Sequence, residues 1–226
     1  MVPAGFWKRY AAWTVDAAVL LPLAYLLTAP QLAVMCNATA TAAQVLLRDV
    51  ATAMARMLAL GGDPFVTAFA FVHDPALLQD SHAVAAAIAR GLQPALLAFA
   101  LLAGGYHVAF EQTRWRGTPG KRLLGIVVAD RNGAAPSLPL SLVRNGAGLL
   151  SWLSLNLGHA IAALPPDHRA LHDRIAGAQV LALRAGLPHW GRAWLMVQLG
   201  LFVLACVGLW WWAQQALDAA LLRALG

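Results

Sequence analysis

The sequence predicts an all-α integral membrane protein, a small helical bundle that also carries a short β-like cytoplasmic hairpin. Of its 226 residues, 60% are hydrophobic and 12% are charged, whereas soluble domains have about 45–50% apolar and about 25% charged residues. The mean hydropathy is +0.64. The apolar residues gather in four stretches, each near the ~17–25 residues that cross a bilayer. The bundle therefore has either three full spans plus one broken or re-entrant segment, or four spans.

The first apolar stretch covers residues 10–29 and follows Lys8 and Arg9. We predict an uncleaved anchor helix, because Asp16 interrupts the apolar region that a signal peptide needs and no small-residue cleavage site follows. A carboxylate at bilayer depth costs ~2.5–3.5 kcal/mol on insertion scales. Asp16 therefore needs a partner, a proton or a function.

Residues 31–90 form an Ala-rich insert with three basic and four acidic residues, Arg48, Arg56 and Arg90 against Asp49, Asp63, Asp74 and Asp80. Between residues 44 and 60, the polar side chains share one helical face, which predicts an amphipathic helix on the membrane surface or against the bundle. The "GGDP" run at 61–64 should end that helix. We interpret the insert as a packed helical cap.

Two further spans are predicted at 91–110, where the helix can begin near His82, and at 193–213, where three consecutive tryptophans suit a membrane interface. Between them, the apolar stretch 146–164 is short and contains three glycines. Either it crosses fully, or it is a broken or re-entrant segment. We favour the second, because basic residues flank both of its ends and a simple crossing would divide them between compartments.

The orientation follows from the distribution of basic residues. Segment 111–145 has six basic and two acidic residues, and such segments stay in the cytoplasm. We therefore expect a multi-pass protein of the cell inner membrane with a cytoplasmic N-terminus and a non-cytoplasmic insert. The formal net charge of +6 fits this orientation, and no basic helix with interleaved aromatics indicates nucleic-acid binding. We expect no disulfide between Cys36 and Cys206.

Three motifs stand in order along the chain: "FWKRYAAWTVD" at 6–16, "GTPGKRLLGIVVADRNGAAPSLPLSLVRN" at 117–145 and "RALHDRIAGAQVL" at 169–181. With these motifs the chain resembles the RDD family of membrane proteins. The resemblance covers about 1–29 and 91–182. It implies an RDD-type membrane domain over 1–182, followed by a linker and a C-terminal transmembrane helix over 183–226.

That family is named for an arginine and an aspartate in its first helix and a second aspartate further on. By resemblance these are Arg9, Asp16 and Asp173. Further matches to the family's pattern are the Gly117–Lys121 run, Gly125, Gly133, Arg144 and His172. One departure is Ala178–Gln179, where the family usually has a threonine after "AG". The resemblance implies an integral membrane domain often suggested to take part in transport, without a named substrate.

We expect transport or ion coupling, with proton-linked cation exchange as its concrete version. The candidate residues are Arg9, Asp16, Arg144, His172, Asp173 and Arg174. The alternative is a non-catalytic membrane scaffold or assembly partner whose Arg and Asp residues form structural pairs. The expected partners are the lipid bilayer, a small cation or proton, and a second copy or another membrane protein. No nucleophile, metal set or nucleotide fingerprint indicates an enzyme or a cofactor.

The state of Asp16 has three readings: a fixed pair with an arginine such as Arg144 or Arg174, a titrating carboxylate, or a neutral side chain bonded locally. A water-accessible cavity that reaches Asp16 would favour transport, and a dry, paired Asp16 would favour the scaffold.

The segment "PPDHRALHDRIAG" predicts a short helix from Asp167, as N-cap, to Gly177. His168 and His172 then share a face at a spacing that can hold a metal, but without a third ligand we expect none.

The "GTPGK" run lacks the spacing of a Walker A loop. We interpret it as a turn that directs Lys121 and Arg122 to lipid headgroups. Downstream, Ile126–Val128 and Gln179–Leu181 have the character of two strands that pair.

Overall fold

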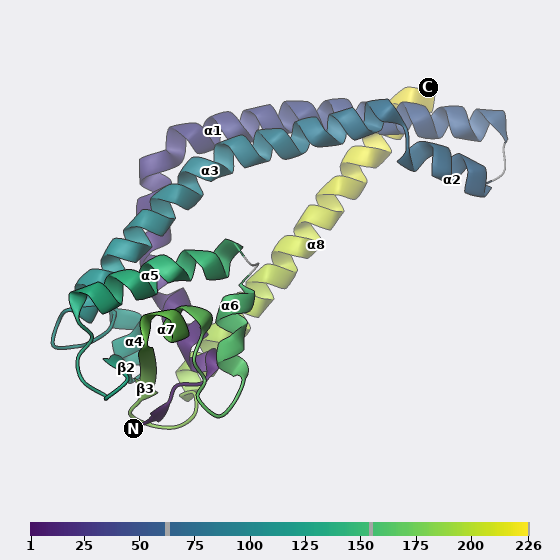
Figure 1. The fold of residues 1–226 in the computed structure, drawn as a ribbon. Helices are drawn as coiled ribbons and strands as arrows, with labels where there is room; N and C mark the ends of the chain where they lie inside the picture. The colour runs from purple at the N-terminus through teal and green to yellow at the C-terminus, as the bar shows by residue number, and fades with distance from the viewer. Residues whose placement is uncertain (62–63, 154–155, 226) are drawn as a thin grey trace. The chain divides into compact units, whose positions relative to one another are not determined.

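The computed structural model describes residues 1–61, 64–153 and 156–225. Three long helices carry most of the chain (Figure 1), namely α1 (Phe6–Leu60), α3 (Pro75–Glu111) and α8 (His189–Leu225). By length and composition, each contains a segment that can cross a membrane: Phe6–Met57, Pro75–Glu111 and His189–Arg223. The predicted membrane class and its three full spans are confirmed.

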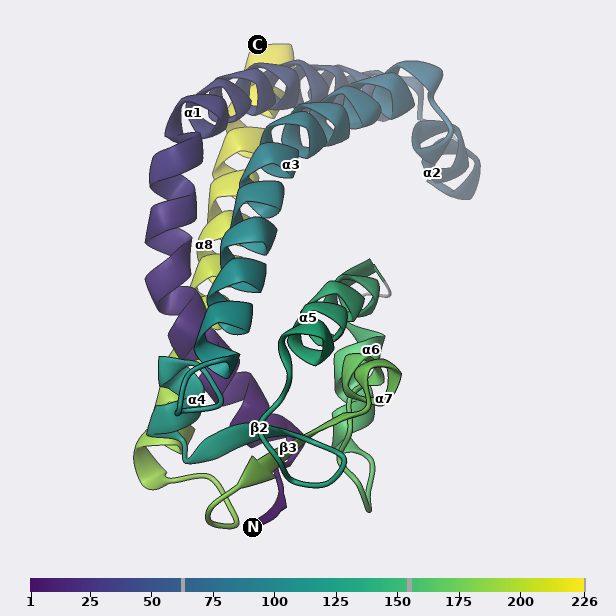
Figure 2. The same ribbon diagram turned by 60° about the vertical axis from the view of Figure 1, so that its left-hand side comes forward.

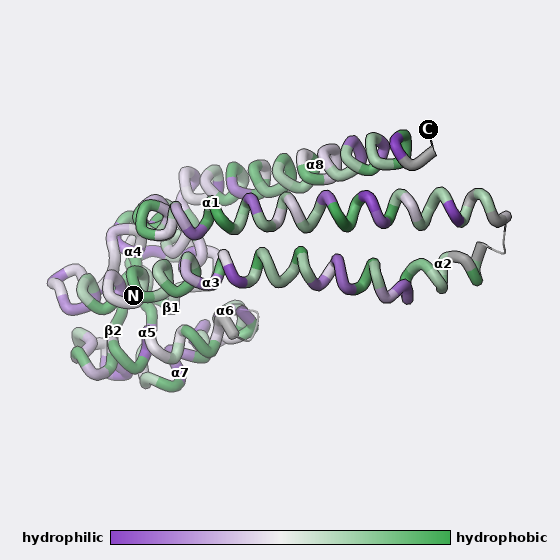
Figure 3. Tube along the Cα trace, turned by 90° about the horizontal axis from the view of Figure 1, so that it is seen from above, coloured by the Kyte–Doolittle hydropathy of each residue, from purple (hydrophilic) through white to green (hydrophobic). Residues whose placement is uncertain are grey.

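Helix α8 shows why a bilayer has to surround this protein. In Figure 3 its colour is predominantly that of hydrophobic residues. None of the residues in its most apolar stretch is buried against the protein. Its side chains Phe202, Leu204 and Trp210 are 67%, 68% and 67% exposed. Apolar area of this extent needs lipid to cover it, because water would penalise its exposure.

Helix α1 is longer than the sequence analysis predicts. It runs unbroken through Pro22 for 55 residues, so the anchor at 10–29 and the amphipathic helix at 44–60 are parts of one helix. The stretch between them is rich in alanine, a strong helix former, and the helix continues through Pro30 as well. Helix α2 (Pro64–Val72) follows. Asp63 and half of the "GGDP" break lie outside the described residues.

The third apolar stretch is broken, as predicted. It forms α5 (Leu138–Leu153), α6 (Leu157–Ala160) and the 3-10 helix η1 (Ile161–Ala163). Asn156, before α6, has a left-handed backbone with φ of 65°, a conformation that asparagine tolerates better than most residues. None of the membrane-crossing segments found among the described residues includes this stretch.

A small antiparallel sheet joins distant parts of the chain. Strand β2 (Ile126–Asp130) pairs with β3 (Ala178–Ala182), with Val128 opposite Val180, which confirms the predicted strand pair. The elements from α5 to α7 separate the two strands, and Figure 2 shows α5, α6 and α7 grouped beside the sheet. An unpredicted strand, β1 (Val2–Pro3), lies on the other side of β3.

Helix α7 (Leu171–Ala176) ends at Gly177, whose φ of 68° makes glycine the natural residue there. Its start differs from the prediction: it begins at Leu171 and not after Asp167. His168 has a φ of 49° and lies before the helix, so it forms no helical pair with His172. The short helix α4 (Pro119–Leu123) begins after Thr118, whose side chain caps it.

The chain divides into two compact units, each described by itself. Unit 1 comprises residues 1–27 and 97–199, and unit 2 comprises 28–96 and 200–226. In unit 1, one apolar core packs the sheet against the start of α1, through buried residues that include Ala11, Ala12, Ile126, Val128 and Val180. A second core joins α1 to α3 around Ala17, Leu20, Phe99 and Ala103.

Candidate functional site

Asp16 is buried within α1, with 1% of its surface exposed, and binds the start of α4. The Thr118 hydroxyl donates to Oδ2 of this carboxylate. The Gly120 amide donates to Oδ1 at 2.7 Å, and the Tyr106 hydroxyl of α3 donates to the same atom at 3.1 Å. The first N–H groups of a helix have no partner inside it, so a carboxylate satisfies them well. Asp16 thereby joins α1, α3 and α4.

Gly120 is the residue that allows this approach. A β-carbon at that position would collide with the Ala12 carbonyl oxygen and would lie 2.8 Å from Oδ2 of Asp16. The "GTPGK" run is thus a recess for the Asp16 carboxylate. The partner of Asp16 differs from the expected arginine, because Arg144 donates to Glu111 and Asp173 instead.

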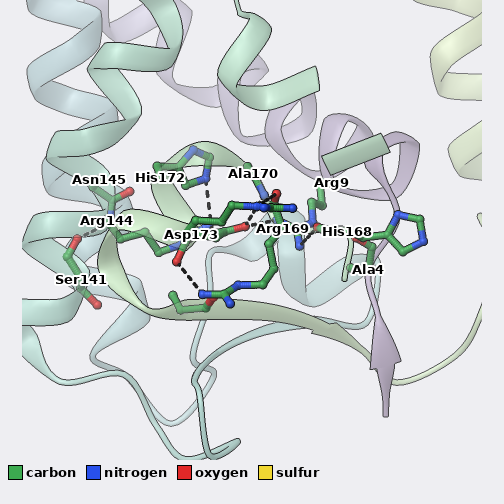
Figure 4. A network of polar contacts seen from close by, with 12 residues as sticks. Ala4, Arg9, Ser141, Arg144, Asn145, His168, Arg169, Ala170, His172 and Asp173 are labelled. Atoms are coloured by element: carbon green, nitrogen blue, oxygen red, sulfur yellow. Dashed lines mark hydrogen bonds and ion pairs between the residues drawn. The ribbon is translucent and has the colours of Figure 1, made fainter. Parts of the chain in front are cut away.

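A second cluster surrounds Asp173 of α7, which is fully buried. Arg9 of α1 donates through Nη1 to Oδ2 of Asp173, and Arg144 of α5 donates through Nε to Oδ1 at 2.8 Å. The Ala170 amide adds a bond to Oδ2 at 3.2 Å, and Nε2 of His172 lies 3.4 Å from Oδ1 (Figure 4). Two guanidinium groups from different helices therefore converge on one carboxylate.

Arg9 also holds the backbone around this cluster. Its Nη2 donates to the His168 carbonyl at 2.5 Å, and its Nε donates to the Ala4 carbonyl at 2.8 Å. All three nitrogens of the guanidinium therefore donate to the protein. They link the chain before α1, the loop before α7 and α7 itself.

Glu111, the last residue of α3, completes the cluster and was not singled out from the sequence. It is 1% exposed, and its Oε1 accepts from Nη1 of Arg144 at 2.5 Å and from Nζ of Lys121 at 2.9 Å. Its Oε2 accepts from Asn145 at 3.3 Å. The sequence signal that could have found Glu111 is its position directly after the apolar stretch 91–110, at the start of the polar segment 111–145.

Five ionised groups form this cluster: Arg9, Lys121, Arg144, Glu111 and Asp173. Burial by itself would raise the pKa of Asp173, but the guanidinium groups of Arg144 and Arg9 outweigh it and hold that pKa well below its usual range. Burial lowers the pKa of His172 to about 3, despite the opposing charge of Asp173. At pH 7 the carboxylate is therefore ionised and the imidazole neutral.

A cavity of about 380 Å³ lies in unit 1 next to this cluster. Its apolar lining residues include Phe6, Tyr10, Trp13, Ala103 and Leu149, which we name the apolar wall. Three cations that share the carboxylates Glu111 and Asp173 also line the cavity, namely Arg9, Lys121 and Arg144, which we name the basic end. Three histidines, His107, His159 and His172, also line the cavity. Among its lining residues there is no aspartate or glutamate, so the carboxylates lie behind the cations.

Within the described ranges, no group of three His, Cys, Asp or Glu residues has a geometry that could hold a metal ion.

Comparison with known proteins connects this geometry to a family. The model described as the RDD family matches residues 3–177, which is more than half of the chain. The chain belongs to the RDD family. No curated protein and no solved structure matches it. The match includes the insert between the first two spans and both polar clusters, and it ends just before strand β3.

The RDD arginine and aspartates all lie in the two clusters. Arg9 and Asp173 pair directly, whereas Asp16 has its own partners at the start of α4. Of the other candidates, Arg144 and His172 line the cavity beside Asp173. Arg9 and Asp16 of α1 thus bind parts of the chain that are far away in sequence: Arg9 binds Asp173 of α7, and Asp16 binds the start of α4.

Arg174 and Lys121 differ from their predicted places. Arg174 is exposed, and its Nε donates a long hydrogen bond of 3.4 Å to the Arg169 carbonyl. Lys121, expected at lipid headgroups, is in the buried cluster because Glu111 attracts its ammonium. Arg122 is exposed.

Proposed function

We propose that this RDD protein is a membrane transport protein whose substrate site is the cavity of unit 1. The observation that carries the proposal is a cavity of about 380 Å³, bounded by α1 and α3, with three cationic side chains at one end. Binding sites for small molecules have volumes of about 300–1,000 Å³ and combine apolar walls with a few convergent polar groups. The buried ion pairs serve as the rigid support of this site.

The charges at the cavity favour an anionic over a cationic substrate. Proton-linked cation exchange needs a carboxylate that meets the cation, yet the described lining contains cations and imidazoles instead. Asp16 is 1% exposed and accepts three hydrogen bonds. These contacts support a structural role for Asp16 within a transporter.

A membrane scaffold is the second candidate, and one observation favours it. Arg9, Arg144 and Asp173 join α1, α5 and α7 through buried bonds, and such pairs are retained in some proteins because they specify one arrangement of the helices. A scaffold requires no solute to move through the cavity, so flux separates the two functions.

The test is flux through proteoliposomes that contain the intact protein. Currents on solid-supported membranes are recorded after concentration jumps of sodium, potassium, phosphate and octanesulfonate. We expect a current for an anion that disappears in Gly148→Leu, because Gly148 lines the cavity and a larger side chain there fills it.

The matched control is Gly146→Leu, on the same helix. At both positions an added β-carbon would meet no atom within 4 Å, but Gly146 is exposed and does not line the cavity. It should retain the current. If the folded wild-type protein gave no current with any of these solutes, the scaffold would be the better assignment.

A further inference from the structure

We propose that the cavity of unit 1 binds an amphiphile with one anionic headgroup that also carries a hydroxyl, with the headgroup at the basic end and the alkyl chain along the apolar wall. A phosphate monoester of a long-chain alcohol has this chemistry as its monoanion, the form with one P–OH that prevails below its second pKa of about 6. The inference rests on the proposed function, because it names the substrate class of the same cavity.

The first argument is a set of imidazole nitrogens without partners. In the described part of the chain, Nδ1 of His107, His159 and His172 is buried and has no hydrogen-bond partner. The three side chains line the same cavity, and two of them, His107 and His172, are only 9% and 7% exposed. A buried polar atom without a partner is destabilising, and such atoms are rare in native proteins. Because these nitrogens have almost no exposed surface, a ligand in the cavity would supply the missing partners once the rings turn towards it.

The ring of His172 also indicates what the headgroup has to offer. The lowered pKa of this residue keeps the ring neutral at pH 7, and a neutral imidazole has one donor and one acceptor nitrogen. Its Nε2 faces Oδ1 of Asp173 at 3.4 Å, which favours the proton on Nε2. Nδ1 is then an acceptor, so it requires a hydroxyl donor from the headgroup.

The second argument is the donor capacity that remains at the basic end. Glu111 and Asp173 accept from Nη1 and Nε of Arg144. Glu111 also accepts from Lys121, whose ammonium has three N–H donors. Within the described residues, Nη2 of Arg144 and the other N–H groups of Lys121 have no acceptor in the protein. Charge-assisted bonds from these groups to ionised oxygens are about twice as strong as neutral ones.

The third argument is the apolar wall. Phe6, Tyr10 and Trp13 stand at successive turns of α1 and line one side of the cavity. Small residues of α3, Ala100, Ala103 and Gly104, line it as well and leave room for a ligand. An inorganic anion would leave these surfaces in contact with water. An alkyl chain would bury them, which is favourable in proportion to the apolar area removed from water.

The experiment measures binding to the full chain, purified in a neutral maltoside detergent. Isothermal titration uses decyl phosphate, inorganic phosphate and decyltrimethylammonium as probes, and phosphatidic acid is added in nanodiscs of phosphatidylcholine. We expect decyl phosphate to bind at least 10-fold more tightly than either inorganic phosphate or the ammonium amphiphile. Phosphatidic acid that competes with decyl phosphate would identify a lipid source, and a lack of competition would identify a free alkyl phosphate.

Two matched pairs of variants locate the site. Gly148→Leu should weaken decyl phosphate binding at least 10-fold, and Gly146→Leu should leave it unchanged. His159→Phe keeps a ring in the cavity but removes the nitrogen, so it should weaken binding several-fold. His189→Phe, at the exposed start of α8, should have no effect. Melting curves confirm that each variant is folded.

Two results would overturn the inference: equal binding of decyltrimethylammonium, or decyl phosphate binding that is unchanged in Gly148→Leu. If inorganic phosphate bound as tightly as decyl phosphate, the alkyl chain would make no contribution and the proposed amphiphilic ligand would be wrong. The proposed transport function fails separately. Decyl phosphate binding without any anion flux would retain this ligand and refute transport, whereas flux of another anion without decyl phosphate binding would retain transport and refute this ligand.

Discussion

Arg144 donates to two carboxylates on two different helices, Glu111 of α3 and Asp173 of α7. The guanidinium is planar and always charged, and its donors match carboxylate geometry. Two carboxylates with 0% exposed side chains share it. Removing it would leave negative charge in a buried site with fewer partners, which is the most costly way to break an ion pair.

We therefore predict that Arg144→Met destabilises the protein by about 3–5 kcal/mol. In a thermal unfolding assay this corresponds to a fall of at least ~6 °C in Tm. Arg174→Met is the control, because Arg174 is exposed and outside the cluster, and its Tm should stay close to wild type. A wild-type Tm for Arg144→Met would show that the cluster does not stabilise the domain.

Asp16 should also contribute to stability through its uncharged partners. Asp16→Asn places an amide N–H₂ group against either the Thr118 hydroxyl or the Gly120 amide, both of which donate to the carboxylate. We expect a loss of about 1–3 kcal/mol, typical of a buried hydrogen bond left unsatisfied. Unfolding of the purified variant, followed by tryptophan fluorescence, measures it. Wild-type stability together with lost flux would instead assign Asp16 to transport.

Stability should fall on acidification because of His172. The pKa of His172 is about 3 in the folded protein, lowered by burial, and about 6.5 in an unfolded chain. Between these values the unfolded state binds the extra proton, so stability decreases as the pH falls from about 6.5 towards 3. One such group contributes a slope of up to about 1.4 kcal/mol for each pH unit.

Asp173 adds to this trend at the acid end. Its pKa is held below the usual range once burial is outweighed by Arg144 and Arg9, so its stabilising effect is present above about pH 4 and is lost below it. We expect His172→Asn to flatten the dependence of Tm on pH between 6.5 and 4.5, whereas His189→Phe should leave it unchanged. An equal slope in wild type and His172→Asn would contradict the assignment.

At the scale of elements, the start of α4 determines how closely α1 can approach it. We predict that Gly120→Ala costs about 1–3 kcal/mol, the usual range for overpacking a filled site, since its β-carbon would collide with Ala12 and crowd Asp16. Gly105→Ala is the control, because a β-carbon there meets no atom within 4 Å. It should be neutral or slightly stabilising. If Gly120→Ala had the same Tm as Gly105→Ala, the prediction would be wrong, because α4 could then move away from α1 without loss of stability.

At the scale of the whole molecule, the sheet constrains the topology. Strand β3 pairs with both β1 and β2, so residues 2–3, 126–130 and 178–182 have to lie on one side of the membrane. An odd number of crossings between β2 and β3 is then impossible, in agreement with the break after α5. Positive charge in 111–145 predicts that this side is the cytoplasm.

Cysteine labelling in intact cells tests this topology. In a background without Cys36 and Cys206, we expect Arg131→Cys and Arg184→Cys to react only after the membrane is opened. His73→Cys, between α2 and α3, should react from the outside. Outside labelling of Arg184→Cys but not of Arg131→Cys would mean that 138–163 crosses the membrane and would refute the sheet.

The sequence by itself determined the membrane class, the three spans, the broken third stretch and the RDD membership. It also predicted the pairing of residues 126–128 with 179–181. These features follow from composition, apolar runs, glycines and short motifs, all of which act over a few turns of chain. Even so, the length of α1 was missed, because Pro22 and Pro30 do not end this helix as prolines usually do.

Only the tertiary structure decided which charges meet. Arg9 and Asp173 are 164 positions apart, Asp16 and Gly120 are 104 apart, and Arg144 and Glu111 are 33 apart. The type of a residue shows that a buried aspartate or arginine needs a partner. It does not show which partner, because several oppositely charged side chains of similar length are available in the sequence. The choice follows from how α1, α3, α4, α5 and α7 pack, because a buried charge is stable only where that packing brings its partner within bonding distance.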